Sequence, residues 1–359
     1  MPEKPLLAQR YRLLTEVGRG GMGTVWHARD EALGRDVAVK EVILPHGFSD
    51  EEREIQHKRT FREARTAARL SHPGVVTVYD VVEEDGRPWI VMELIRARSL
   101  EQMIKQDGPL TPRRAAEIGR QMLSALMTAH EAGILHRDVK PSNVLVSDAR
   151  SIRAVLTDFG IARAQSDATL TQTGMLIGSP AYIAPERARG RAAVSASDLW
   201  SLGATLYAAV EGKSPFERTE AMASLVAVLT EEPAPAPHAG PLAPVIAGLL
   251  RKDPNTRMTA TEVGAMLDRI LMNNASATQV LGAIDIEPDA SRTEPDEPLD
   301  VPSDMPVTGQ VMTPPEPEEE AAADDAARPV WLSGRNGNLA IAVVLVVIVI
   351  GLIILTLVL

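Results

Sequence analysis

Five short motifs in a fixed order constrain the fold of this chain more than any other feature of its sequence. In chain order they are GRGGMG at residues 18–23, VAVK at 37–40, HRDVKPSN at 136–143, DFG at 158–160 and APE at 184–186. One motif of this length can arise by chance, but the probability that all five arise by chance in this order is negligible. Any fold of the globular residues therefore has to accommodate all five.

The glycine-rich motif has two interpretations, which the residues after it distinguish. Glycines without side chains let backbone amides approach phosphates closely, and the same spacing occurs in dinucleotide-binding folds. The dinucleotide fold requires a helix directly after the glycines, whereas TVWHARD at 24–30 is strand-like. We therefore expect the glycines to join two strands.

Lys40 lies inside an apolar, strand-like segment, where an ammonium group is costly unless it is paired. Glu63, in the helical segment FREARTAARL at 61–70, is an available partner. An ion pair with Glu63 would direct the ammonium toward the α- and β-phosphates of a nucleotide. The alternative is an edge lysine with its charged head in solvent.

Apolar periodicity predicts a strand-rich first part and a helix-rich second part of the globular region. Residues 49–70 are predicted to be helical, with Ser49 and Glu52 spaced as a capping box. Residues 75–94 are predicted to form a hairpin that turns at Asp85. Helical patterns dominate from residue 101 onward.

Together the motifs resemble those of the protein-kinase superfamily, over residues 11–272. DFGIAR and GSPAYIAPERARG are more narrowly similar to the bacterial eukaryotic-like Ser/Thr kinases that carry a transmembrane anchor. The resemblance implies an α+β, two-lobed protein-kinase fold. Its β-rich small lobe is expected at about 11–92 and its α-rich large lobe at about 97–272.

The resemblance implies that the chain transfers phosphate from ATP to protein Ser or Thr, with Mg²⁺ as the metal and Mn²⁺ as an alternative. Asp138 would accept the proton of the substrate hydroxyl, and Lys140 would neutralise charge on the transferring group. Asn143 and Asp158 would supply hard oxygen ligands to the metal. His136 and Phe159 are expected to pack and not to take part in the chemistry.

The nucleotide-binding residues implied by the resemblance come from the glycine loop, the lysine strand, the helix that follows it and the segment between the lobes. They are Val17, Gly18, Gly20, Gly21, Gly23, Val25, Ala38, Lys40, Glu63, Met92, Glu93 and Ile95. Met92 would form a wall of the adenine pocket, and the backbone of 93–95 would offer hydrogen bonds to adenine.

Residues 158–186 resemble an activation loop that contains several hydroxyl side chains. Thr171 and Thr173 are predicted autophosphorylation sites that switch the enzyme on, and Thr169 is a further candidate. A phosphothreonine there could order the loop against Arg137. The alternative is that these threonines are simply polar loop residues.

Four other residues are expected to support the site without taking part in the chemistry. The hydroxyl of Ser179 could bond Asp138 and Lys140, and Asp198 is predicted to bond the backbone of the catalytic loop. Glu186 and Arg257 are predicted to form a structural salt bridge.

Residues 273–338 form an acidic, Pro-rich segment that we expect to be a disordered juxtamembrane linker. Residues 273–330 hold fourteen Asp and Glu against two Arg, a local net charge of −12. The whole chain carries −11, so the acidity belongs to this segment and the remainder is close to neutral. This charge argues against nucleic-acid binding by the segment. The chain has no Cys, which excludes disulfides, thiolate metal sites and a cysteine nucleophile.

Residues 339–359 form an uncharged apolar run of twenty-one residues. A helix of this length spans about 31 Å, which matches a hydrocarbon core of roughly 30 Å. The run is predicted to be a transmembrane helix that anchors the C-terminal end, in a single-pass cell-membrane protein with a cytoplasmic kinase domain. Arg328 and Arg335 precede it, in weak agreement with the positive-inside rule.

Partners implied by the resemblance are protein substrates, the membrane and a second copy that pairs through the small lobe as a homodimer. Thr293 in TEPD resembles a phosphothreonine site for forkhead-associated domains, although a solvated spacer is the simpler interpretation. The competing functions are a membrane-anchored pseudokinase scaffold, which degraded motifs would favour, and a small-molecule phosphotransferase, which would lack the APE-type loop.

Overall fold

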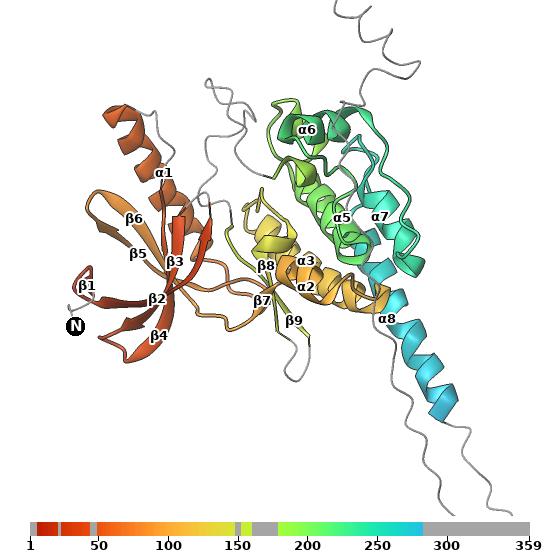
Figure 1. Cartoon of the computed structure of the whole chain (residues 1–359), viewed down its shortest axis with the longest axis horizontal. Coiled ribbons are helices and arrows are strands. Elements are labelled where there is room, and N and C mark those ends of the chain that lie inside the picture. Colours follow the sequence, from red (N-terminus) through yellow and green to blue (C-terminus); the bar gives the residue numbers. More distant parts are fainter. Residues whose placement is uncertain (1–5, 21–22, 44–48, 148–151, 160–178, 283–359) are drawn as a thin grey trace, which may run out of the picture. The chain divides into compact units, whose positions relative to one another are not determined.

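The computed structural model describes residues 6–20, 23–43, 49–147, 152–159 and 179–282 (Figure 1). The predictions for Gly21, Thr169, Thr171 and Thr173 lie outside these residues, as do those for the linker beyond residue 282 and for the apolar run 339–359. No helix among the described residues has both the length and the apolar character needed to cross a bilayer.

The first part of the described chain is a six-stranded antiparallel sheet with one long helix, and it carries the predicted strand-rich pattern. The strands follow the spatial order β1-β2-β3-β4-β6-β5. The elements are β1 (Leu6–Leu7), β2 (Tyr11–Gly20), β3 (Gly23–Asp30), β4 (Arg35–Glu41), α1 (Asp50–Ala67), β5 (Val78–Glu84) and β6 (Arg87–Met92).

The second part is mostly helical, with one small three-stranded sheet in the order β7-β8-β9. Its first elements are β7 (Arg98–Ser99), α2 (Leu100–Asp107), α3 (Pro112–Glu131), η1 (Pro141–Asn143), β8 (Val144–Ser147) and β9 (Arg153–Leu156). They are followed by η2 (Pro180–Tyr182), α4 (Pro185–Ala188), α5 (Ser195–Glu211), α6 (Ala221–Thr230), η3 (Gly240–Leu242), α7 (Ala243–Leu249) and α8 (Ala260–Gly282). The predicted order of a strand-rich and then a helix-rich part is therefore confirmed.

Local sequence signals account for where several elements begin and turn. The Ser49 hydroxyl accepts from Glu52 N at 3.2 Å, and the Glu52 carboxylate accepts from Ser49 N at 2.8 Å, so the predicted capping box starts α1. Asp85 and Gly86 have φ angles of 51° and 67°, the left-handed conformations that a tight hairpin between β5 and β6 requires.

Strand β4 shows how the sheet faces two environments. Val37 and Val39 are fully buried in a cluster with Tyr11 and Val91 on one face. Ala38 lies on the opposite face, in the main apolar core that continues into the helices, because successive strand residues alternate between the two faces. Lys40 shares the Ala38 face, so the strand pattern directs its side chain toward the interior of the site.

Helix α5 is the centre of the helical part. Every residue from Ser197 to Val210 is buried, and the helix packs against α3 and α7 (Figure 1). It ends at Gly212, whose φ of 88° is the left-handed conformation that glycine tolerates best. A helix buried on all sides is a rigid support for the residues packed on its first turn.

Candidate active site

The loop before η1 and the end of η1 bring together the two predicted catalytic residues, Asp138 and Lys140, and the predicted metal ligand Asn143. Lys140 Nζ lies 3.1 Å from Asp138 Oδ2. Asn143 Nδ2 donates to the same oxygen at 3.1 Å and to the backbone oxygen of Asp138 at 2.8 Å. Because Asn143 uses its nitrogen for these bonds, its Oδ1 remains an acceptor that suits a hard cation.

Asp198 holds the backbone of this loop in place from the first turn of α5. Its carboxylate accepts from Arg137 N at 2.8 Å and from His136 N at 2.9 Å, and it contacts His130 Nε2 at 2.8 Å. Burial alone would raise the pKa of Asp198, but the hydrogen bond from His130 outweighs this effect and lowers it. These are the backbone bonds predicted for Asp198, and they stabilise the left-handed φ of 67° at Arg137.

His136 is a packing residue, as its sequence context predicted. It is fully buried, its Nε2 lies 2.9 Å from Thr157 O, and its ring centroid lies 4.4 Å from that of Phe159. Burial lowers its pKa, so the ring is neutral at pH 7. Phe159 is 3% exposed and holds the start of the DFG segment against the same ring.

Lys40 forms its ion pair with Asp158. Lys40 Nζ lies 2.6 Å from Asp158 Oδ1, and Lys40 is 9% exposed. Burial tends to raise the pKa of Asp158, but the charge and the hydrogen bond of Lys40 outweigh this effect and lower it. Asp158 also has a φ of 63°, a conformation that non-glycine residues adopt mainly where the surroundings hold them, as at functional sites.

The predicted ion pair between Lys40 and Glu63 is not formed, so this prediction was wrong for the structure at hand. Glu63 Oε1 instead lies 3.8 Å from Arg137 Nη1, and Glu63 Oε2 is buried without a hydrogen-bond partner among the described residues. The physical reason is competition, because Asp158 already neutralises Lys40. Burial raises the pKa of Glu63, although Arg137 partly opposes this.

The glycine-rich segment joins β2 to β3, as predicted, and no helix follows it. Gly18 pairs with Val25, and Gly20 pairs with Gly23. A Cβ on Gly18 or Gly20 would meet no atom of the described residues within 4 Å, so they leave room there for a ligand. Gly23 differs, because its φ is 134° and a Cβ would lie 1.9 Å from Glu41 O. Gly23 is therefore required by the fold itself.

The other predicted nucleotide-binding residues lie along the neighbouring strands and the segment after β6. Val25 pairs with Lys40, and Ala38 pairs with Met92, which is 7% exposed. Val17 is 58% exposed. After β6, Glu93 N donates to Thr77 O at 2.8 Å and Ile95 O accepts from Ala97 N at 3.1 Å.

Two backbone groups in the segment after β6 remain available to a ligand. Within the described residues, Glu93 O accepts no hydrogen bond and Ile95 N donates none. An acceptor and a donor two residues apart suit the edge of an adenine ring. The residues present therefore fit the base of a nucleotide.

The side chains at the metal position also fit a cation held jointly with a nucleotide. Among the described residues, no cluster of three or more His, Cys, Asp or Glu could hold a metal unaided. Asn143 Oδ1 and the charged Asp158 carboxylate provide a small oxygen set of the kind that Mg²⁺ uses when substrate phosphates and water complete its shell.

Glu186 and Arg257 form the predicted structural salt bridge. Arg257 Nη1 and Nη2 lie 2.9 and 3.0 Å from the two carboxylate oxygens, and both residues are buried. Ser197 Oγ donates to the same carboxylate at 2.8 Å. Burial would raise the pKa of Glu186, but the bond and charge of Arg257 lower it overall.

The bonds predicted from the Ser179 hydroxyl to Asp138 and Lys140 are not present. Ser179 instead begins η2, where its backbone oxygen accepts from Tyr182 N at 3.2 Å. Asp138 Oδ2 already accepts from Lys140 and Asn143. Within the described residues, the Ser179 hydroxyl is not part of this cluster.

The structure adds supporting residues that the sequence did not reveal. Arg187 is buried, and its Nη1 donates to Arg137 O at 2.6 Å, which ties the residue after the APE motif to the catalytic loop. His130, at the end of α3, supports Asp198. His130 belongs to no quoted motif, and Arg187, although it lies within GSPAYIAPERARG directly after Glu186, was given no role from the sequence.

The comparisons with known proteins agree with this geometry. Residues 11–266 match the family described as protein kinase domain. The chain is 44% identical to the serine/threonine-protein kinase PknA of Mycobacterium tuberculosis, over 64% of this chain and 53% of that protein. It is 38% identical to a probable serine/threonine-protein kinase of Corynebacterium efficiens, over 76% of this chain and 43% of that protein.

A third relative, the serine/threonine-protein kinase PrkC of Bacillus subtilis, is 38% identical over 71% of this chain and 39% of that protein. The chain thus spans about half or less of the length of these relatives. The match nevertheless covers every described motif, from the glycine loop to the buried Glu186–Arg257 pair. By its fold, by the residues of its site and by this match, the chain belongs to the protein kinase family.

Proposed function

We propose that the chain is a serine/threonine protein kinase that uses ATP with Mg²⁺, or with Mn²⁺ as an alternative. The observation that carries the proposal is the cluster in which Lys140 and Asn143 both bind Asp138 Oδ2. The names of the relatives support Ser and Thr as the acceptors.

Asp138 would hold the substrate hydroxyl and take its proton as the oxygen attacks in line. Lys140, bound to the same carboxylate, places a positive charge beside the attacking oxygen. The bound metal–nucleotide complex supplies the phosphoryl group and the chemistry of its transfer. Asn143 and Asp158 would hold the metal, and Lys40 would turn from Asp158 toward the nucleotide phosphates.

The pseudokinase alternative is not favoured, because the residues that a degraded site would lack are present and mostly held in a common cluster. The test is transfer of labelled phosphate from Mg-ATP to a generic protein acceptor, followed by phosphoamino-acid analysis. Phosphoserine and phosphothreonine are expected. Absence of transfer to any acceptor, with the nucleotide still bound, would support the pseudokinase scaffold.

We also propose activation by autophosphorylation at Thr171 and Thr173, with Thr169 as a further candidate. The support is the position of these threonines between the DFG and APE motifs and the presence of Arg137 at the catalytic loop, where a phosphate could replace Glu63 as its partner. Undiminished activity in a variant with both threonines replaced by Ala would refute this mechanism.

The apolar run 339–359 is proposed to anchor the protein in the cell membrane with the kinase domain in the cytoplasm. Its length and lack of charge support this proposal. Fractionation of cells that express the full chain should place it with the membranes in a form that resists high salt. Recovery in the salt wash would argue against an anchor.

Three kinds of protein partner are proposed from the family resemblance. They are Ser/Thr substrates, a second copy of the chain as a homodimer, and forkhead-associated-domain proteins that bind Thr293 once it is phosphorylated. Mass spectrometry of the chain after incubation with ATP tests the last of these. A linker without phosphate would count against it.

A further inference from the structure

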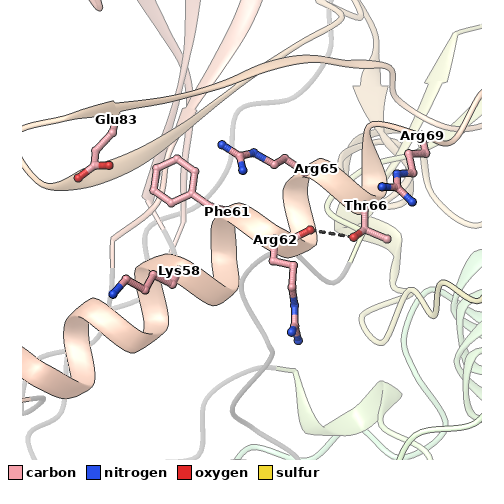
Figure 2. A pocket seen from close by; sticks show the side chains of 7 residues that line it. All are labelled: Lys58, Phe61, Arg62, Arg65, Thr66, Arg69 and Glu83. Carbon is pink, nitrogen blue, oxygen red and sulfur yellow. Dashed lines mark hydrogen bonds between the residues drawn. The ribbon is translucent and has the colours of Figure 1, made fainter.

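Helix α1 carries a basic cavity on the face that does not bear Glu63. Its lining residues are Lys58, Phe61, Arg62, Arg65, Thr66, Arg69 and Glu83, and its volume is about 450 Å³. Figure 2 shows Lys58, Phe61, Arg62 and Arg65 projecting from successive turns of the helix, with Glu83 on the neighbouring strand. Spacings of three and four residues place these side chains on adjoining turns.

Most of the positive charge in this cavity is not neutralised. Arg62, Arg65 and Arg69 are exposed and form no ion pair with any other described residue. Lys58 pairs with Glu54 at 2.7 Å, but both of these side chains are more than 60% exposed, so the contact is weak. The N–H groups of three guanidinium side chains therefore face solvent and form no ion pair within the described residues.

The remaining lining residues narrow the kind of ligand that fits. The partly buried Phe61 gives the cavity an apolar surface, and the Thr66 hydroxyl already donates its proton to Arg62 O at 2.8 Å. A volume of about 450 Å³ exceeds what one phosphate ion fills and lies in the range of pockets that hold a drug-sized ligand. Guanidinium groups bind carboxylates through two parallel hydrogen bonds.

We propose that this cavity is a docking site for an acidic peptide segment of a partner protein, with an apolar side chain of the segment resting on Phe61. A nucleic acid is the weaker fit, because its phosphate backbone requires an extended positive track. Here Glu83 closes one side of the cavity, and Glu63 lies on the adjoining face of the same helix. The proposal does not rest on phosphoryl transfer, since none of the catalytic side chains lines the cavity.

The test is fluorescence anisotropy with the full chain and a labelled peptide of eight residues that contains four Glu and one Phe. Binding is expected to weaken with salt, and to weaken at least about tenfold when Arg65→Gln and Arg69→Gln are combined. Glu83→Gln should tighten binding, because it removes the carboxylate of the lining. Circular dichroism verifies that each variant is folded.

The matched control combines Arg53→Gln with Arg59→Gln, which removes the same charge from exposed positions of the same helix outside the cavity. Affinity within about twofold of the wild type is expected for this control. An equal loss in the control, or no loss in the Arg65 and Arg69 variant, would overturn the proposal. Equal affinity for a single-stranded oligonucleotide of the same charge would overturn the assignment to a peptide.

Discussion

Lys40 Nζ lies 2.6 Å from Asp158 Oδ1, whereas Glu63, the residue expected to hold Lys40, contacts Arg137 at 3.8 Å. The lysine of β4 is thus bound to the carboxylate proposed to hold the metal. Binding of a metal and nucleotide would release Asp158 from Lys40 and give each a new partner. Glu63 would then be free to move from Arg137 to Lys40.

Lys40→Met removes both the cation beside Asp158 and the group proposed to hold the phosphates. Phosphoryl transfer should fall at least about 100-fold. Because the charge and the hydrogen bond of Lys40 no longer offset burial, the pKa of the Asp158 carboxyl should rise, and Mn²⁺ affinity should drop more steeply than in the wild type as pH falls from 7 to 5. Kinetics and Mn²⁺ titrations measure these effects. Lys105→Met, at an exposed position of α2, is the control, and wild-type behaviour of Lys40→Met would contradict the assignment.

The glycines of the β2–β3 loop should respond differently to substitution. In Gly23→Ala the new Cβ meets Glu41 O and the φ of 134° is strained, so the free energy of unfolding should fall by at least about 1–3 kcal/mol. Gly20→Ala adds a Cβ in open space and should leave stability within about 0.5 kcal/mol, while weakening nucleotide binding. Denaturant unfolding measures the free energy of unfolding of both variants. Equal destabilisation would contradict the conformation described for the β2–β3 loop.

Local signals in the sequence predicted much of this fold. The capping box at Ser49, the turn at Asp85 and the strand after the glycines depend on neighbouring residues, and the structure has all three. The bonds of Asp198 and the Glu186–Arg257 pair followed from the family resemblance.

Contacts that depend on the relative position of distant segments could not be predicted in the same way. Two carboxylates, those of Glu63 and Asp158, could each pair with Lys40. Which of them does so depends on where α1 lies relative to the catalytic loop. The same holds for Arg187, whose bond to Arg137 O spans fifty residues of sequence.

Arg257→Gln should destabilise the fold strongly, because it leaves the buried Glu186 carboxylate without its cation. The expected loss at pH 7 is about 3–5 kcal/mol. The pKa of Glu186 is lowered in the folded wild type, so its contribution is complete above the unfolded pKa and is lost as pH falls through the folded pKa. In the variant, burial without Arg257 raises the pKa of Glu186. The difference in free energy of unfolding between wild type and variant should therefore shrink as pH falls from 7 to 4. Thermal unfolding across this range measures it, and a deficit independent of pH would count against the ion pair.

Lys252 should make stability depend on alkaline pH. Its Nζ lies 4.4 Å from the Phe216 ring centroid and donates to Val228 O at 2.6 Å, and burial lowers its pKa to about 8. The unfolded chain therefore binds more protons than the folded chain between pH 8 and about 10.5, so this residue makes stability rise with pH in that window. Relative to Lys252→Met, the wild type should gain stability from pH 8 to 10. A constant difference would show that the lysine titrates normally.

Asp138→Asn tests the proposed activity most directly, because it removes the proposed proton acceptor and keeps the size and shape of the side chain. The measurement is the rate of phosphate transfer from Mg-ATP to Ser and Thr of an acceptor protein, together with the nucleotide dissociation constant. We predict a rate lower by about 10²–10⁴-fold, with nucleotide affinity unchanged within about threefold because Lys40 and Asp158 are intact. A variant that transfers phosphate at the wild-type rate would contradict the assignment of Asp138 and, with it, the proposed function of the cluster.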